Sequence, residues 1–363
     1  MKKWISLLLV GALLLSGCGR KEPPVVETTT APTTAPTTEP TTEPTTEPTT
    51  EPAPVYTNPL NGQVLDEPYT GRVYAVSVSN VRDALPHYGT MKADIVMEMW
   101  VNHSIIRNLA LFTNPQDAQR IGSVRSDRLM FNQIALHYDA IVVDAAGSNQ
   151  VLNDARNKGV DRLMVDTSGD QDYAVRDTSR DFLFKPASKY EHCLFAKGDG
   201  LQAYAELNGF STTQPEDKDY GLRFREDGTP EGGETANTVS LTFTYKNNLK
   251  ATDMVYDADL DQYVYHQYEK EMIDGATGEQ ESFTNVIIML ADITRPDIYY
   301  VANFTAGGTG YYACGGKIIP ITWSCEDENS PFRFQTLDGQ PLELGVGNTY
   351  MAIAPQASPV SYS

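Results

Sequence analysis

The sequence has 363 residues and carries 48 Asp and Glu against 28 Lys and Arg, which gives a formal net charge of -20. Such a chain repels nucleic acid, so we expect no nucleic-acid partner. The five histidines and four cysteines show neither the spacing of zinc ligands nor a disulfide framework, and we predict no metal site and no cofactor.

Residues 1–18 have the order of a secretory signal. Lys2 and Lys3 precede the apolar run WISLLLVGALLL, which ends at LSGC. These last four residues match the lipobox of bacterial lipoproteins, in which the cysteine is acylated and becomes the first residue of the mature chain. The apolar run is too short to cross a bilayer comfortably. We therefore predict a lipid anchor at Cys18, and a cleaved signal with a chance cysteine is the alternative.

Residues 19–57 are predicted to be a disordered stalk. They repeat Thr, Pro and Glu and contain almost no apolar side chains, so they cannot offset the entropy of folding. Regular prolines favour extended conformations, at about 3 Å per residue as an upper limit. Either the stalk is a spacer through a thick envelope, or it is a passive linker whose length hardly matters.

Residues 58–212 are predicted to form an α+β domain. Four apolar runs have the composition of buried strands, and two segments have the apolar spacing and end residues of helices. We expect Ser148 or Asn149 to cap the second helix and Gly159 to end it. The expected strands are residues 72–80, 93–101, 104–113 and 139–147, and the expected helices are residues 126–138 and 148–159.

Residues 236–363 are predicted to form a mostly antiparallel β domain, joined to the first by the polar connection 213–235. Short β-type runs follow one another between Gly, Asp and Asn turns, without a convincing helix. Residues 213–363 carry 9 basic against 23 acidic side chains, whereas residues 61–212 carry 15 against 19. The acidity of the protein is therefore concentrated in its second half.

Several familiar chemistries find no support in the sequence. There is no HExxH motif, the AAGSNQ stretch lacks the pattern of a nucleophile elbow, and Cys314 has no adjacent base. DADLD imitates a calcium loop, but Gln262 stands where that loop needs glycine, so a hairpin turn is favoured. A bridge between Cys314 and Cys325 is left open, because it requires Cα atoms within roughly 7 Å.

The stretch RIGSVRSDR, residues 120–128, places three arginines just before and inside an expected helix start. Guanidinium groups and free helix N–H groups together can bind an anion. Alternatively, the arginines hold strand to helix by pairing with nearby acids such as Asp117, Asp127, Asp139 and Asp144. The candidate anion-binding residues are Arg120, Gly122, Ser123, Arg125, Ser126 and Arg128, with Arg107, Asp144 and Ser148 as supporting residues.

The segments YAVSVSNVRDALPHYGTMKADIVMEMWV, IGSVRSDR, HYDAIVVDAAGS and GGTGYYACGGKIIPITW resemble the YerB-like lipoproteins, a bacterial family of unknown function. The resemblance spans nearly all of the expected folded chain. It implies an α+β layered fold and an extracytoplasmic lipoprotein, and it implies no reaction. The family's central motif falls on Gly122, Val124, Arg125, Ser126 and Arg128, with Asp127 where a small residue is usual.

Two other family motifs are altered in this chain. The motif EGGITR corresponds to VNHSIIR, which keeps Arg107 but replaces the acid and both glycines, and the His-Asn pair corresponds to His192 and Cys193. The altered motif puts any function of its backbone turn in doubt.

Two classes of function follow from these observations. The first is a binding or scaffolding lipoprotein on the outer face of the cytoplasmic membrane, exposed to the cell wall, which recognises an anionic wall polymer or an envelope protein. It would touch the membrane through its lipid anchor alone. The alternative is a hydrolase or transferase of wall polymer, with Asp94, Glu98 or Asp144 as acid and base. We favour binding, because no nucleophile, metal set or cofactor loop stands out.

Overall fold

The computed structural model describes residues 54–178, 187–216, 218–245 and 248–363, and residues 54–363 form one compact unit. The predicted signal, Cys18 and the stalk up to residue 53 lie outside the described residues. Residues 54–57, which we assigned to the stalk, belong to the fold, because β1 (Tyr56–Thr57) pairs with β2 (Val64–Leu65).

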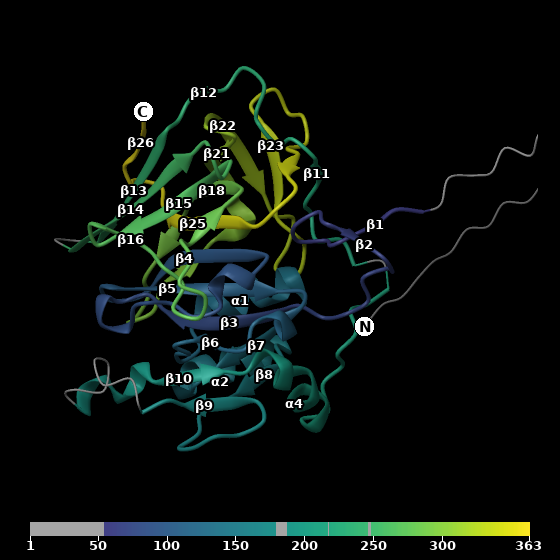
Figure 1. The fold of residues 1–363 in the computed structure, drawn as a ribbon, viewed down its shortest axis with the longest axis vertical. Helices are drawn as coiled ribbons and strands as arrows, with labels where there is room; N and C mark the ends of the chain where they lie inside the picture. The colour runs from purple at the N-terminus through teal and green to yellow at the C-terminus, as the bar shows by residue number, and fades with distance from the viewer. Residues whose placement is uncertain (1–53, 179–186, 217, 246–247) are drawn as a thin grey trace, which may run out of the picture. The chain divides into compact units, whose positions relative to one another are not determined.

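The fold is of the predicted α+β class (Figure 1). The helices of the described residues are α1 (Leu129–Tyr138), α2 (Asn149–Lys158) and α4 (Leu201–Leu207), with short 3-10 turns between strands. The strands of the first half are β3 (Tyr74–Ser79), β4 (Ile95–Asn102), β5 (Ile105–Phe112), β6 (Ile121–Gly122), β7 (Ile141–Asp144), β8 (Arg162–Met164), β9 (Ala174–Arg176) and β10 (Leu194–Ala196).

The second half contains only strands and one 3-10 turn among its described residues, as predicted. Its strands are β11 (Phe224–Arg225), β12 (Glu234–Thr235), β13 (Thr238–Tyr245), β14 (Asn248–Asp257), β15 (Gln262–Gln267), β16 (Lys270–Glu271), β17 (Ser282–Phe283), β18 (Asn285–Ala291), β19 (Ile293–Thr294), β20 (Val301–Ala302), β21 (Gly308–Cys314), β22 (Lys317–Ser324), β23 (Arg333–Thr336), β24 (Leu344–Gly345), β25 (Thr349–Pro355) and β26 (Val360–Tyr362). The DADLD stretch is the turn between β14 and β15.

One large sheet runs through both halves of the chain. Its strand order is β12-β22-β21-β18-β25-β4-β5-β3-β7-β8, with β23 paired to β22. The seam is β25, which pairs in parallel with β18 on one side and with β4 on the other, so that Thr349 faces both Asn285 and Ile95. In Figure 1 the yellow strand β25 accordingly lies beside the blue strand β4.

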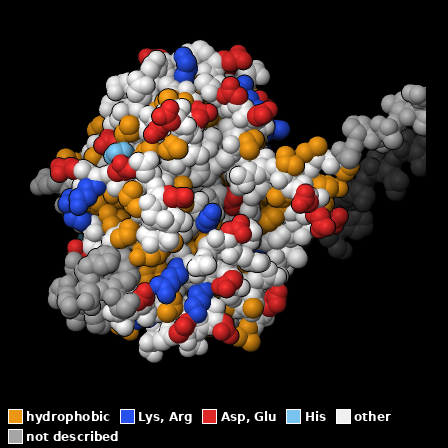
Figure 2. Space-filling model, viewed as in Figure 1, with side chains coloured by type: hydrophobic (Ala, Val, Ile, Leu, Met, Phe, Trp, Pro, Cys, Tyr) orange, Lys and Arg blue, Asp and Glu red, His pale blue; other side chains and the backbone are white. Residues whose placement is uncertain are grey.

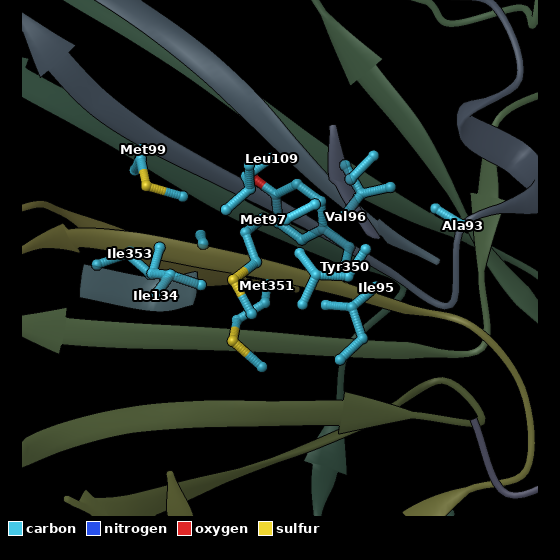
Figure 3. Close-up of a cluster of buried hydrophobic side chains, with 14 of the residues drawn as sticks. Ala93, Ile95, Val96, Met97, Met99, Leu109, Ile134, Tyr350, Met351 and Ile353 are labelled. Carbon is cyan, nitrogen blue, oxygen red and sulfur yellow. The ribbon is translucent and has the colours of Figure 1, made fainter. Parts of the chain in front are cut away.

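The central strands of this sheet are buried on both faces. All six residues of β3 and seven of the eight residues of β4 are buried, which explains their nearly continuous apolar sequences. On one face, Met97, Met351 and Ile353 pack with Ile134 of α1 (Figure 3). The other face is covered by a second sheet of order β16-β15-β14-β13-β26, with β17 paired to β15.

A buried charge network joins the two sheets. The carboxylate of Glu98 on β4 accepts hydrogen bonds from Asn80 Nδ2 at 2.7 Å and from Thr252 Oγ1 at 2.9 Å. Tyr350 also donates to it, and the ammonium group of Lys250 on β14 forms an ion pair with it. Burial lowers the pKa of Lys250, and the Glu98 charge opposes this shift. A buried carboxylate bonded in this way is stable only while its partners stay in place.

A second buried pair lies nearby. His87 Nδ1 lies 3.0 Å from Glu281 Oε1, and both side chains are almost fully buried. Burial alone lowers the pKa of His87, but the charge and hydrogen bond of Glu281 outweigh it, so the net pKa is raised. The protonated imidazole is thus the form that the fold favours.

We expect this pair to make stability depend on pH. Because the pKa of His87 is raised in the folded state, its stabilising contribution is complete below its ordinary pKa of about 6.5 and is lost as the pH rises through the raised value. Urea unfolding of His87→Gln should show a smaller fall in the free energy of unfolding between pH 6 and 9, and a loss of about 3–5 kcal/mol at pH 6. His266→Gln is the control; an unchanged pH profile in His87→Gln would contradict the assignment.

Candidate anion-binding site

The arginine stretch lies among strands and does not lead directly into a helix. Gly122 lies in β6, paired with Phe195 of β10, and its N–H donates to the carbonyl of Tyr88 at 3.0 Å. Its φ of +153°, with Val124 N only 2.7 Å from where a Cβ would lie, requires glycine. Helix α1 begins only at Leu129.

The proposed helix N-terminal site at Gly122 and Ser123 is therefore wrong. The carbonyl oxygen of Ser123 accepts from Ser79 N at 2.9 Å, and Arg125 N donates to Ser77 O at 2.8 Å. Backbone groups that pair with strand β3 in this way point into the fold, so they offer no helix-end donors to a ligand.

The three arginines of the stretch diverge. Arg120 pairs with Asp177 at 2.7 Å, and Arg125 pairs with Glu191 Oε2 at 3.0 Å. Arg128 donates to the carbonyl oxygen of Asp127 at 2.6 Å and lies over the ring of Tyr299. The structural alternative, pairing with acids, thus holds for Arg120 and Arg125, although their partners are more distant in sequence than we expected. Arg120 does not belong to the site described below.

Arg107, which we expected to play a supporting role, is the central residue of the site. Its side chain is only 2% exposed. One of its Nη atoms donates to the carbonyl oxygen of Ser126, and no carboxylate of the described residues lies within ion-pair distance of it. Burial, followed by repulsion from Arg128 and Arg125, lowers its pKa well below the ordinary value. A buried cation without a counterion is costly, and a bound anion would remove that cost.

Arg107 lines a cavity of about 410 Å³ that we call the arginine pocket. Register places Ser79, at the end of β3, directly opposite Arg107 on β5. Arg82 stacks over the ring of Tyr268, with its guanidinium carbon 5.0 Å from the ring centre. The residues that line the arginine pocket are Ser79, Val81, Arg82, Asp83, Ile105, Arg107, Arg125, Glu191 and His192.

Two carboxylates lie behind the arginine stretch, outside the pocket lining. Arg162 Nε lies 3.0 Å from Asp127 Oδ2, and its Nη2 lies 2.7 Å from both oxygens of Asp144. Burial raises the pKa of Asp127 to about 7, although Arg162 opposes the shift, and the pKa of Asp144 is raised well above its usual value. This triad fastens the stretch to β7 and β8.

The remaining candidate residues from the sequence make hydrogen bonds within the fold and lie outside the arginine pocket. Ser148 caps α2, accepting from Val151 N at 3.4 Å, as expected for its other role. The Asp94 carboxylate accepts hydrogen bonds from Asn58, Asn61 and Thr113. It shares none of these partners with the Glu98 network. None of Asp94, Glu98 and Asp144 lines the arginine pocket.

The disulfide that the sequence left open is absent from the described residues. Cys314 and Cys325 are free and buried, so the bridge between them does not form. Cys314 and Lys317 are cross-strand partners beside the turn of the β21–β22 hairpin, whereas Cys325 follows the opposite end of β22.

Sequence reasoning missed several residues of the arginine pocket. Arg82 lies shortly after the end of β3, and Ile105 starts β5, so both could have been found if the pairing of these strands had been known. Glu191 comes from the 3-10 turn Ala187–His192, 66 residues beyond Arg125, and no local pattern announces it.

Comparisons with known proteins agree with this fold. Residues 60–211 match the N-terminal domain, and residues 239–351 the C-terminal domain, of a family described as "Protein of unknown function (DUF3048)". The "Putative lipoprotein YerB" of Bacillus subtilis (strain 168) is 26% identical over 310 residues, covering 84% of this chain and 88% of the relative. The crystal structure of the YerB protein from Bacillus subtilis matches with a TM-score of 0.70 at 24% identity, covering 84% of this chain and 99% of that one.

Two kinds of feature are absent from the described residues. No helix there is both long and apolar enough to cross a bilayer. No group of three or more His, Cys, Asp or Glu side chains there is arranged to hold a metal ion.

The triad behind the stretch makes a stability prediction. Arg162→Gln leaves two buried carboxylates without a counterion and should lower the free energy of unfolding by about 3–5 kcal/mol. Adding Asp127→Asn should restore part of this loss, because the three groups act as one unit. Arg156→Gln, on the exposed face of α2, is the control and should stay within about 0.5 kcal/mol of the parent. Strictly additive losses in urea unfolding would contradict a coupled triad.

Proposed function

The chain belongs to the DUF3048 family of proteins of unknown function, and from that premise we propose that it is a lipid-anchored extracytoplasmic protein that binds an anionic group in the arginine pocket. The anchor is proposed from the lipobox ending at Cys18 and from the name of the Bacillus subtilis relative. The proposed location is the outer face of the cytoplasmic membrane, with the compact unit exposed to the cell wall. The partner is an anionic wall component or an envelope protein.

The observation that carries the binding proposal is the buried charge of Arg107, which has no carboxylate of the described residues within ion-pair distance. Arg125 and Arg82 line the same cavity, so a carboxylate or phosphate there would meet up to three guanidinium groups. Each charge-assisted hydrogen bond in a sheltered site contributes about 1.5–3 kcal/mol. Two such bonds would suffice for binding in the millimolar range or tighter.

The rest of the surface favours a small anionic group over a long polyanion. In Figure 2 the Lys and Arg side chains form separate blue spots among red acidic side chains, rather than a continuous stripe. With a net charge of -20, the protein repels anionic polymers over most of its surface. An anionic chain end or substituent that enters the pocket escapes this repulsion through local attraction.

We expect Arg107→Gln to weaken anion binding. The measurement is a calorimetric titration of the full-length protein in detergent with inorganic phosphate and with acetate. The affinity should fall at least tenfold, because one lost charge-assisted bond contributes more than about 1.4 kcal/mol. The variant should melt at or above the parent temperature, because a buried charge has been removed. Arg333→Gln, an exposed arginine paired with Asp219, should bind like the parent. Equal affinity in Arg107→Gln would refute the proposed site.

The anchor has its own test. Cells that express the chain should incorporate labelled palmitate into it, and Cys18→Ala should lose the label and release the protein from the membrane fraction, because one attachment site carries the anchor. Cys193→Ala, which removes a buried cysteine of the fold, is the control and should keep the label. Membrane retention of unlabelled Cys18→Ala would exclude Cys18 as the anchor.

A further inference from the structure

We propose that the arginine pocket binds a zwitterion, a small molecule or chain end that carries a carboxylate and a protonated amine a few bonds apart, as an amino acid does. This inference rests on the proposed anion-binding function and names its ligand class. The carboxylate would lie against Arg107, and the ammonium group would lie against Glu191.

The pocket contains an exposed acid as well as the buried arginine. Arg107 is 2% exposed, whereas the side chain of Glu191 is 53% exposed. A simple anion matches only the charge of Arg107, whereas a zwitterion can match both charges.

Glu191 can accept an ammonium group without losing its present partner. Its Oε2 accepts from Arg125 Nη2 at 3.0 Å, and its Oε1 lies 3.5 Å from His192 Nε2. A carboxylate has about four lone-pair sites, so an ammonium donor adds to these contacts. Arg125 then bridges the two ends of the site, since its guanidinium group neighbours both Glu191 and Arg107.

The size and lining of the pocket also fit a molecule larger than an inorganic anion. Its volume of about 410 Å³ exceeds ten times the roughly 30 Å³ that one water molecule occupies in the liquid. Val81 and Ile105 give it an apolar wall. A short carbon skeleton between the two charged groups would pack on that wall and displace its water.

A matched pair of ligands tests the proposal. Alanine and propionate share one carbon skeleton and differ in the amine, so calorimetric titration of the full-length protein in detergent isolates the contribution of that group. We expect alanine to bind at least tenfold more tightly than propionate, and ethylamine, which lacks the carboxylate, to bind at least tenfold more weakly than alanine. Alanyl-alanine, with its charges further apart, separates a free amino acid from a peptide as the source.

Glu191→Gln should then reverse the preference. It should lower the affinity for alanine at least tenfold and leave the affinity for propionate equal or higher, because the repulsion from Glu191 is gone. Glu206→Gln, an exposed glutamate on α4, is the matched control and should change neither. Arg107→Gln should weaken both ligands.

The outcomes separate this inference from the proposed function. If propionate and alanine bind equally and Arg107→Gln weakens both, the anion site stands and the zwitterion proposal is overturned. If Glu191→Gln weakens both ligands alike, Glu191 only positions Arg125, and the zwitterion proposal is again overturned. If neither ligand nor inorganic phosphate binds the parent protein, both proposals fail.

Discussion

The carboxylate of Glu98 is the point on which the two layers of strands depend. It is fully buried on β4 of the large sheet, and Lys250, which neutralises it, comes from the sheet that covers this face. A shift of one sheet along the other would leave each buried charge without its partner, so the layers hold a single arrangement. The same arrangement helps to position Arg82 in the arginine pocket. Arg82 stacks on Tyr268, and the ring of Tyr268 lies close to the ammonium group of Lys250.

Local patterns in the sequence predicted most elements, and long-range pairings were beyond them. The apolar runs predicted β3, β4, β5 and β7. Helix α2 begins after the cap at Ser148 and ends at Gly159, as expected. Nothing local indicates that β25 inserts between β18 and β4, because any buried strand of similar length has the same composition. Residues 213–235 likewise contain strands whose partners lie in other segments.

The candidate site illustrates the same limit at the scale of side chains. The motif drew attention to Arg125 and Arg128 because arginines so close together in an acidic chain need an explanation. Acids elsewhere in the chain decide which arginine of the stretch keeps a free charge. Asp177, for example, pairs with Arg120. Arg107 stands out only after folding, when its burial and the absence of an ion-pair partner among the described residues become visible. A motif in one chain therefore marks a location better than it assigns a role.

The place of β25 has a consequence for how the protein matures. This strand ends at residue 355, yet it lies in the middle of the large sheet and closes the edge of β4. Until that part of the chain has been synthesised, β4 presents an unpaired, apolar edge that neighbouring chains can capture. The central sheet therefore cannot be completed until the last strands of the chain are available.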